Sequence, residues 1–251
     1  MAKTLDSLTE ALLEAAHKAG ADAADAVSVD GQSISIDVRN GQLEQAERSE
    51  GVEIGLRVLV DGRQACVSAS DTRSETISAM AERAIAMARE APQDPWCGLA
   101  DPGQLATEWN LAELDLVDPN SSLSAADLQV AALAAEAAAL SVNGVTKMDA
   151  AGAGWSSTHV HIAASNGFSG GYGRSSHSVQ AVAICGEGAS MERDYAFETR
   201  VYHADLPDPG EIGRLAGERT VSRSGAVQPQ TGPFPVLFDE RIASSLMGHL
   251  I

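Results

Sequence analysis

The stretch Val52-Glu53-Ile54-Gly55-Leu56-Arg57-Val58-Leu59-Val60, which runs into Asp61-Gly62, decides how this chain folds. Its apolar side chains recur at every second position, and a period of two places them on one face of a β-strand. Asp30-Gly31 and Asn40-Gly41 lie upstream, between similar alternating runs. Asp-Gly and Asn-Gly pairs favour the positive φ angles of tight hairpins. The sequence therefore predicts a mostly antiparallel sheet that turns at all three pairs.

Helical patterns lie on both sides of this predicted sheet. Residues 5–16 place apolar side chains on one helical face and are followed by Gly20, a typical helix stop. Residues 77–88 repeat the helical spacing after the last predicted strand. Residues 1–90 are therefore predicted to form one N-terminal α+β domain with the order helix, antiparallel sheet, helix.

A second unit with the same order of elements is predicted further along the chain. Residues 91–120 carry four prolines and little periodicity, as expected of a linker. Residues 121–230 begin with an Ala- and Leu-rich helix, continue with alternating segments, and end with a helix capped by Asp208. We expect long antiparallel hairpins between these two helices, which makes this stretch a central α+β domain.

The last segment, 231–251, predicts one strand and one helix. Residues 234–238 have the composition of a short strand, and Asp239 is placed to cap a helix with an apolar stripe. The stripe continues to Ile251 without a stop signal. We therefore expect the first strand and helix of a C-terminal domain, with the stripe made to pack against residues that are missing here.

Charge and cysteine content narrow the function classes. Seventeen basic and 35 acidic residues give a formal charge of −18, which repels nucleic-acid phosphates and anionic lipid headgroups. Cys66, Cys97 and Cys185 form no CxxC pair, so neither a disulfide framework nor a thiolate zinc site is indicated. No apolar run reaches the roughly 18 residues of a membrane span, and the first residues do not resemble a secretion signal. We expect a cytoplasmic protein without direct nucleic-acid or membrane contact.

Three histidines suggest a possible metal site. His159 and His161 stand two residues apart on a predicted strand and would project from one face, and His177 could lie on the neighbouring strand. Against zinc binding, no acidic residue is evidently placed to orient the imidazoles. An exposed sheet face can carry histidines without any ligand, and we favour that interpretation.

Other candidate motifs are equally open to a structural explanation. Ser175-Ser176 beside His177 lacks the GxSxG elbow of a nucleophile, and a hairpin strand explains it more simply. The glycines at 152–154 and 170–173 lack the setting of a dinucleotide site, so turns are the favoured interpretation. Four acidic residues could hold a cation or act as a general base, although a solvated strand face is favoured: Glu187, Glu192, Asp194 and Glu198. We assign no catalytic, cofactor-binding or metal-binding residue.

The predicted strands themselves could have a function. Long antiparallel strands with polar, glycine-interrupted edges can accept an extended peptide as an added strand, through main-chain hydrogen bonds. This would suit a protein that handles unfolded chains. Alternatively, a partner or the missing residues cover these edges, and the sequence does not separate the two.

Several stretches resemble the TldD/PmbA family, also called modulator of DNA gyrase. They are Arg39-Asn40-Gly41-Gln42-Leu43-Glu44, Gly55-Leu56-Arg57-Val58, Ser165-Asn166-Gly167-Phe168, Glu218-Arg219-Thr220-Val221 and, most specific, Thr231-Gly232-Pro233-Phe234-Pro235-Val236-Leu237-Phe238-Asp239. The resemblance spans nearly the whole chain. It implies three domains, of which this chain would hold the first, the second and the start of the third.

The resemblance also implies a site that this chain lacks. Family members of the TldD kind carry HExxxH on the helix after the strand that matches residues 235–238, where the histidines bind zinc and the glutamate activates water. None of the six histidines here is followed by glutamate, and the matching positions hold Met247 and Gly248. The ending Gly248-His249-Leu250 instead resembles the PmbA (TldE) branch.

The resemblance therefore implies a PmbA/TldE-like subunit in a heterodimer. A TldD-like zinc peptidase subunit would be its partner, and the two would enclose an unfolded peptide for cleavage. Two alternatives remain: a metallopeptidase active in its own right, and a regulator of DNA gyrase that works without proteolysis.

Overall fold

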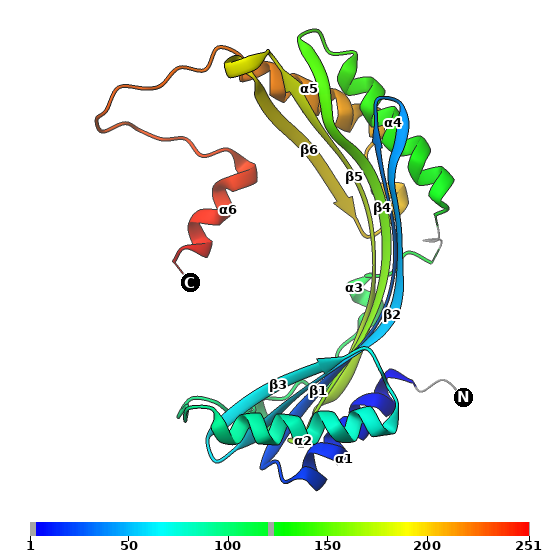
Figure 1. The fold of residues 1–251 in the computed structure, drawn as a ribbon, viewed down its shortest axis with the longest axis vertical. Helices are drawn as coiled ribbons and strands as arrows, with labels where there is room; N and C mark the ends of the chain where they lie inside the picture. The colour runs from blue at the N-terminus through cyan, green and yellow to red at the C-terminus, as the bar shows by residue number, and fades with distance from the viewer. Residues whose placement is uncertain (1–3, 120–122, 251) are drawn as a thin grey trace.

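The computed structural model describes residues 4–119 and 123–250, and its central feature is one curved sheet (Figure 1). All neighbouring strands run antiparallel, in the order β3-β2-β1-β4-β5-β6. The strands are β1 (Ala23–Arg39), β2 (Gln42–Val60), β3 (Arg63–Ala69), β4 (Val145–Ala164), β5 (Ser169–Cys185) and β6 (Glu192–Arg200). The predicted antiparallel α+β fold is confirmed.

Two pairs of helices cover the convex face of this sheet, one pair at each end: α1 with α2, and α4 with α5 (Figure 1). The helices are α1 (Leu5–Ala19), α2 (Ser74–Glu90), α3 (Leu111–Leu114), α4 (Ala125–Leu140), α5 (Pro209–Ser222) and α6 (Glu240–Gly248). The predicted order of helix, strands and helix occurs twice. Helices α1 and α2 enclose the first three strands in sequence, and α4 and α5 enclose the last three. No helix among residues 4–119 and 123–250 is long and apolar enough to cross a membrane.

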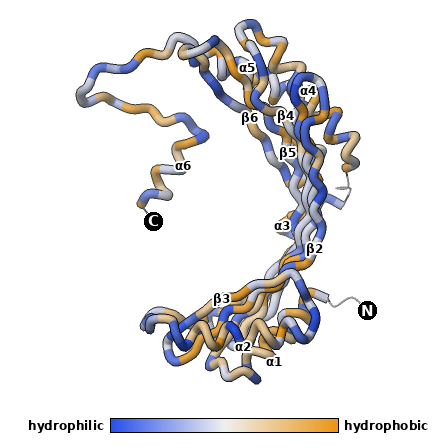
Figure 2. Tube along the Cα trace, viewed as in Figure 1, coloured by the Kyte–Doolittle hydropathy of each residue, from blue (hydrophilic) through white to orange (hydrophobic). Residues whose placement is uncertain are grey.

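Two hydrophobic cores lie under these helix pairs. The first joins α1 and α2 to β1, β2 and β3, with Leu12, Leu56 and Met80 among its buried side chains. The second joins α4 and α5 to β1, β4, β5 and β6, with Ile36 and Val179 among its members. Figure 2 shows the strands most hydrophobic near α1 and α2 and paler midway along the sheet. The sheet is therefore anchored at its two ends and leaves its middle open.

Two of the three predicted turns are confirmed, and one is wrong. Asn40-Gly41 and Asp61-Gly62 have positive φ angles at all four positions, as tight hairpins require. Asp30-Gly31 instead lies inside β1, where Gly31 pairs with Gly51 on one side and Thr158 on the other. Partners on both sides keep this stretch extended, so the Asp-Gly preference for turning is overridden by sheet pairing.

The predicted strand at 234–238 is also absent from the structure. These residues form no strand, although the helix that follows is present as α6, and the Asp239 side chain accepts a hydrogen bond from Arg241 N. A strand needs a neighbour for its main-chain donors and acceptors. No described strand pairs with this segment, so its residues do not form a strand despite their strand propensity.

Candidate functional site

Neither helix pair covers the concave face of the sheet (Figure 1). Because side chains alternate along a strand, the residues between the buried positions of β4 and β5 point to this face. Midway along the sheet they are small: Gly154 pairs with Ser178, and Ser156 pairs with Ser176. Small side chains leave the sheet surface accessible, so an extended chain can lie close to it.

The glycines of these strands serve close packing and not turns. The sequence favoured turns at 152–154 and 170–173, but all of these residues lie inside β4 or β5. A Cβ at Gly152 would stand 2.3 Å from Asp37 Oδ1, and one at Gly171 would stand 2.3 Å from the Val160 carbonyl oxygen. Neither position can carry a side chain without moving its neighbour.

The small residues midway along the concave face, Gly154, Ser156, Ser176 and Ser178, are called the small-residue belt below. Large apolar side chains are exposed beside this belt. Tyr195 and Phe197 of β6 are nearly half exposed near one end of the belt. Toward the other end, Ile162 of β4 and Tyr172 of β5 line an apolar pocket of about 390 Å³ together with residues of the linker, including Trp109. The concave face can therefore contact both the main chain and the apolar side chains of an extended ligand.

The C-terminal helix α6 is tied to the β6 edge of the sheet. Arg241 donates to Asp194 Oδ1 at 2.8 Å and to the Tyr195 carbonyl at 3.2 Å, and its guanidinium lies 5.1 Å from the centre of the Tyr195 ring. Burial opposes ionisation of Asp194, but the hydrogen bonds from Arg241 and from Tyr195 N outweigh it and lower the pKa of this carboxyl. Asp194 is therefore the charged anchor between α6 and the sheet.

Three of the four acidic residues singled out in the sequence, Glu192, Asp194 and Glu198, form ion pairs. Besides its bonds to Arg241, Asp194 lies 3.4 Å from Arg223, which also approaches Glu192 at 3.7 Å. Glu198 pairs with Arg200 at 2.6 Å. These carboxylates have basic partners, an arrangement that suits structural anchoring better than cation binding.

The three histidines that were considered as zinc ligands, and disfavoured, do not meet. His159 pairs with Gly173, four residues along β5 from His177, which separates the two histidines by about 13 Å. The His161 ring lies 2.9 Å from Thr9 Oγ1 of α1 and 3.4 Å from Ser169 Oγ. Sequence spacing gave the correct shared face for His159 and His161, but the strand register places His177 elsewhere. Within the described residues, no three His, Cys, Asp or Glu side chains are grouped to hold a metal ion.

The buried His177 belongs to a cluster with the buried Asp118 and the exposed His203, which the sequence did not reveal. Its Nε2 lies 3.5 Å from Asp118 Oδ2, and its ring meets that of His203 with 5.4 Å between centres. Asp118 comes from the linker and accepts a hydrogen bond from His203 N at 3.0 Å. Burial lowers the pKa of His177, and His203 lowers it further, while Asp118 acts in the opposite direction. The separation of these three residues in sequence explains why no pattern indicated them.

Ser175 and Ser176 form hydrogen bonds that connect neighbouring segments of the fold. Ser175 Oγ accepts from Asp118 N at 2.8 Å and donates to the Val201 carbonyl at 2.9 Å. Ser176 Oγ lies 3.0 Å from Thr199 Oγ1 on the neighbouring strand. Ser175 therefore connects the linker to the end of β6, in agreement with the favoured interpretation of a hairpin strand.

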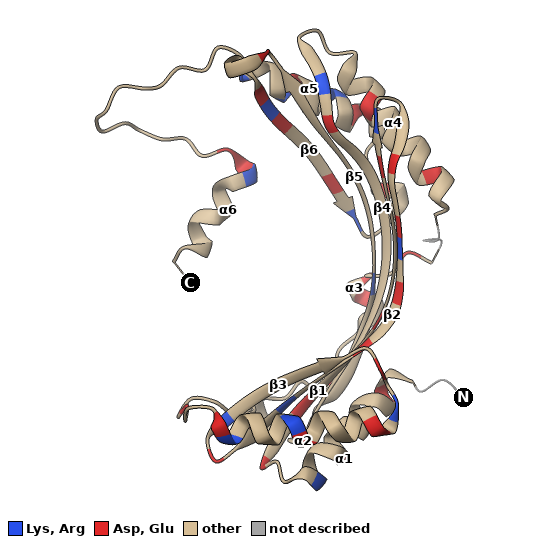
Figure 3. Ribbon diagram, in the orientation of Figure 1, with Lys and Arg blue, Asp and Glu red and all other residues tan. Residues whose placement is uncertain are grey.

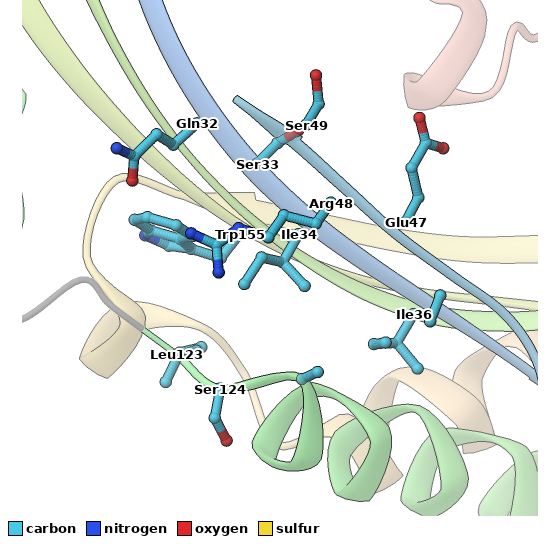
Figure 4. Close-up of a pocket in the computed structure, with 12 residues that line it drawn as sticks. Gln32, Ser33, Ile34, Ile36, Glu47, Arg48, Ser49, Leu123, Ser124 and Trp155 are labelled. Carbon is cyan, nitrogen blue, oxygen red and sulfur yellow. The ribbon is translucent and has the colours of Figure 1, made fainter. Parts of the chain in front are cut away.

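A second hollow, of about 550 Å³, lies between the convex face and the start of α4 (Figure 4). Trp155 and Ile34 point from the sheet toward Leu123, and Arg48 lies beside the indole. The indole N–H of Trp155 is buried and has no hydrogen-bond partner among the described residues. Residues 120–122, which adjoin Leu123, lie outside the described part of the chain.

Two family models match the chain, and together they cover more than half of it. Residues 24–88 match PmbA/TldA metallopeptidase domain 1, and residues 118–224 match the PmbA/TldA metallopeptidase central domain. The chain belongs to the PmbA/TldD family. The family assignment made from the sequence is thereby confirmed.

Relatives of known name agree with this assignment. Metalloprotease PmbA of Escherichia coli O157:H7 is 29% identical over 221 residues, which are 87% of this chain and 48% of the relative. The PmbA homologue of Haemophilus influenzae is 29% identical over 245 residues, which are 94% of this chain and 52% of the relative. The chain thus spans about half the length of the curated relatives it matches.

Solved structures show the same fold. A proposed modulator of DNA gyrase from Bacteroides thetaiotaomicron superimposes with a TM-score of 0.86 at 24% identity, over 97% of this chain and 55% of that one. TldE from Thermococcus kodakarensis gives a TM-score of 0.69 at 18% identity, over 89% of this chain and 49% of that one. This chain therefore shares its fold, the curved sheet with two helix pairs, with these solved structures.

Proposed function

We propose that this PmbA/TldD-family chain is the non-catalytic, PmbA/TldE-like subunit of a TldD/TldE-type metallopeptidase complex that acts on unfolded peptides. The observation that carries the proposal is the composition of α6. At the positions where a zinc-binding member would have the first histidine and the glutamate, this chain has Met247 and Gly248. A thioether is a poor zinc ligand, and glycine can neither bind zinc nor move a proton.

The described residues therefore do not fit a zinc centre of the HExxxH kind. In the proposed complex, a TldD-like partner supplies the zinc and the water-activating glutamate. The present chain supplies a concave sheet on which an extended peptide can lie, held mainly through its main chain. This division of roles agrees with the small side chains of Gly154 and Ser178 midway along the sheet.

The proposed setting is the cytoplasm, since the cysteines are free and unpaired with one another. The formal charge of −18 opposes direct contact with DNA or anionic membranes. The partners we propose are thus a TldD-like subunit and an unfolded peptide.

Co-expression of the full-length protein with a TldD-like subunit tests the proposal. We expect the two chains to co-purify, with zinc and cleavage of unfolded casein in the complex and neither in the full-length protein alone. A partner whose motif glutamate is replaced by glutamine is the control, because it should keep the complex and lose cleavage. Stoichiometric zinc together with cleavage by the full-length protein alone would show instead a metallopeptidase active in its own right.

A second candidate function is regulation of DNA gyrase without proteolysis. It is favoured by one observation, the similarity to proteins described as proposed modulators of DNA gyrase. Because the chain has a formal charge of −18, it would contact the gyrase protein and not the DNA. Purified gyrase should then change its supercoiling rate when the full-length protein is added without any TldD-like chain, whereas the subunit proposal expects no change.

A further inference from the structure

The linker forms one wall of the apolar pocket on the concave face. Where β6 ends, the linker takes its place beside β5, and Ser175 N donates to the Leu116 carbonyl at 3.0 Å. The segment before Leu116 includes α3 and Trp109, and it closes a pocket of about 390 Å³ against Ile162 and Tyr172. This volume is at the lower end of the range of roughly 300–1,000 Å³ for ligand sites.

The residues that form the pocket walls pack closely against one another. The Trp109 ring packs on Phe168 with 5.9 Å between centres. A Cβ at Gly170 would lie 2.3 Å from Trp109 Cζ2, so the indole fits only because residue 170 is glycine. Side chains from the linker, β4, β5 and the turn between them are thus matched to one another.

The walls of this pocket are open to solvent. Leu114 is 57% exposed and Tyr172 is 46% exposed, and Trp109, Leu111 and Ile162 are exposed to a similar degree. Large apolar side chains gathered at one exposed place mark an interaction site more often than scattered ones do. An apolar occupant would remove this surface from water.

The charge around the pocket is acidic. Residues 90–146 contain no lysine or arginine, while Glu108 and Glu113 flank the pocket residues of the linker. Figure 3 shows acidic residues at α3, which forms part of the pocket wall. Arg174 of β5 is the nearest basic residue along that strand, two positions from Tyr172 on the same face. The balance of charge favours a cationic ligand over an anionic one.

We propose that this pocket anchors a large apolar side chain of an extended peptide, with basic residues on either side of it. The inference rests on the proposed function, in which the concave face holds unfolded peptide, and it adds a preference among peptides. The apolar side chain enters between Trp109 and Tyr172, and its basic neighbours face Glu108 and Glu113.

Fluorescence anisotropy with labelled Gly/Ser peptides tests the inference on the full-length protein. One peptide carries Lys-Phe-Lys, and the comparison peptides carry Lys-Ser-Lys or Glu-Phe-Glu. Leu114→Ser removes an exposed pocket wall, and Leu43→Ser, at the β1–β2 hairpin, is the matched control because Leu43 is 48% exposed. Equal thermal melting of both variants checks that each one folds.

We expect the wild-type protein to bind Lys-Phe-Lys at least about tenfold more tightly than either comparison peptide. Leu114→Ser should remove most of the advantage of Lys-Phe-Lys over Lys-Ser-Lys, and Leu43→Ser should keep it. If Lys-Phe-Lys and Lys-Ser-Lys bind equally, or if Leu114→Ser keeps the wild-type preference for Lys-Phe-Lys, the pocket does not anchor an apolar side chain. If Glu-Phe-Glu binds as tightly as Lys-Phe-Lys, the proposed preference for basic neighbours is wrong. Zinc content and co-purification are separate measurements, so the pocket and the subunit role can fail independently.

Discussion

At the scale of single residues, His177 is the most unusual side chain of the described chain. It is 1% exposed, and among residues 4–119 and 123–250 neither ring nitrogen finds a hydrogen-bond partner. Burial and His203 lower its pKa, and the attraction of Asp118 only partly offsets them. The native state therefore favours the neutral imidazole.

This burial predicts a loss of stability in mild acid. In the unfolded chain, His177 regains its ordinary pKa of 6.5, so protonation favours the unfolded state. Above pH 6.5 the imidazole is neutral in both states, and its burial does not lower the free energy of unfolding. As the pH falls from 6.5 toward the lower pKa of the folded state, the free energy of unfolding decreases. Urea unfolding about one pH unit above and below the ordinary pKa should show the decrease in wild type and a smaller decrease in His177→Phe.

The control for this prediction is His17→Phe, since His17 is an exposed residue of α1. That variant should keep the wild-type dependence of unfolding on pH. If His177→Phe and His17→Phe show the same dependence as wild type, the burial of His177 does not control stability in this pH range.

Residue types predicted the local caps but not the cluster of His177, Asp118 and His203. Asp208 and Asp239 were placed correctly as helix caps, because a cap depends on neighbours within one turn. The meeting of His177 with Asp118 depends on how the linker crosses β5. No short pattern in the sequence carries that information, and the same holds for the pocket around Trp109.

At the scale of elements, α4 and α5 pack unusually closely. A Cβ at Gly213 of α5 would lie 2.0 Å from the Ala135 carbonyl oxygen of α4, which is part of the backbone and cannot turn aside. Gly213→Ala should therefore force the helices apart and lower the free energy of unfolding by about 1–3 kcal/mol. Thermal melting measures the loss.

Gly248→Ala provides the matched control for this prediction. Gly248 is also helical, but a Cβ there would meet nothing within 4 Å. Alanine at an open helical position should stabilise α6 by roughly 0.5–1 kcal/mol. Equal melting temperatures for the two variants would show that the α4 and α5 contact tolerates a methyl group.

Sequence patterns identified most helices and strands, and they failed where strand pairing determines the conformation. The longer helices and two of the hairpin turns followed from local periodicity and from Asn-Gly and Asp-Gly chemistry, whereas the short α3 lies in the stretch predicted as a linker. Asp30-Gly31 was misassigned as a turn because strands on both sides hold it extended. Residues 234–238 were misassigned as a strand because no described neighbour pairs with them. Both errors concern partners that are distant in the sequence.

At the scale of the whole molecule, the two helix and strand units share a single sheet (Figure 1). Strand β1 contributes Ala24 and Ala26 to the first core and Ile36 and Val38 to the second. Periodicity could not show this, because the pairing of β1 with β4 joins segments more than a hundred residues apart. The division into domains at 1–90, 91–120, 121–230 and 231–251 stays a prediction.

The shared strand leads to a prediction about cooperativity. Ile36 is 2% exposed in the second core, so Ile36→Ala should lower the free energy of unfolding by about 2–5 kcal/mol. Because β1 is continuous between the cores, the loss should spread to the first core. Hydrogen exchange should therefore accelerate in α1 as well as in α4.

Ile162→Ala separates this coupling from a general effect of removing isoleucine from the sheet. Ile162 is 41% exposed on the concave face and belongs to neither core, so its loss should change exchange in α1 and α4 little. If Ile36→Ala accelerates exchange in α4 and leaves α1 at the wild-type rate, the two cores unfold independently despite their common strand. In that case the sheet connects two separate stability units, and a peptide bound on its concave face would stabilise only the unit that it touches.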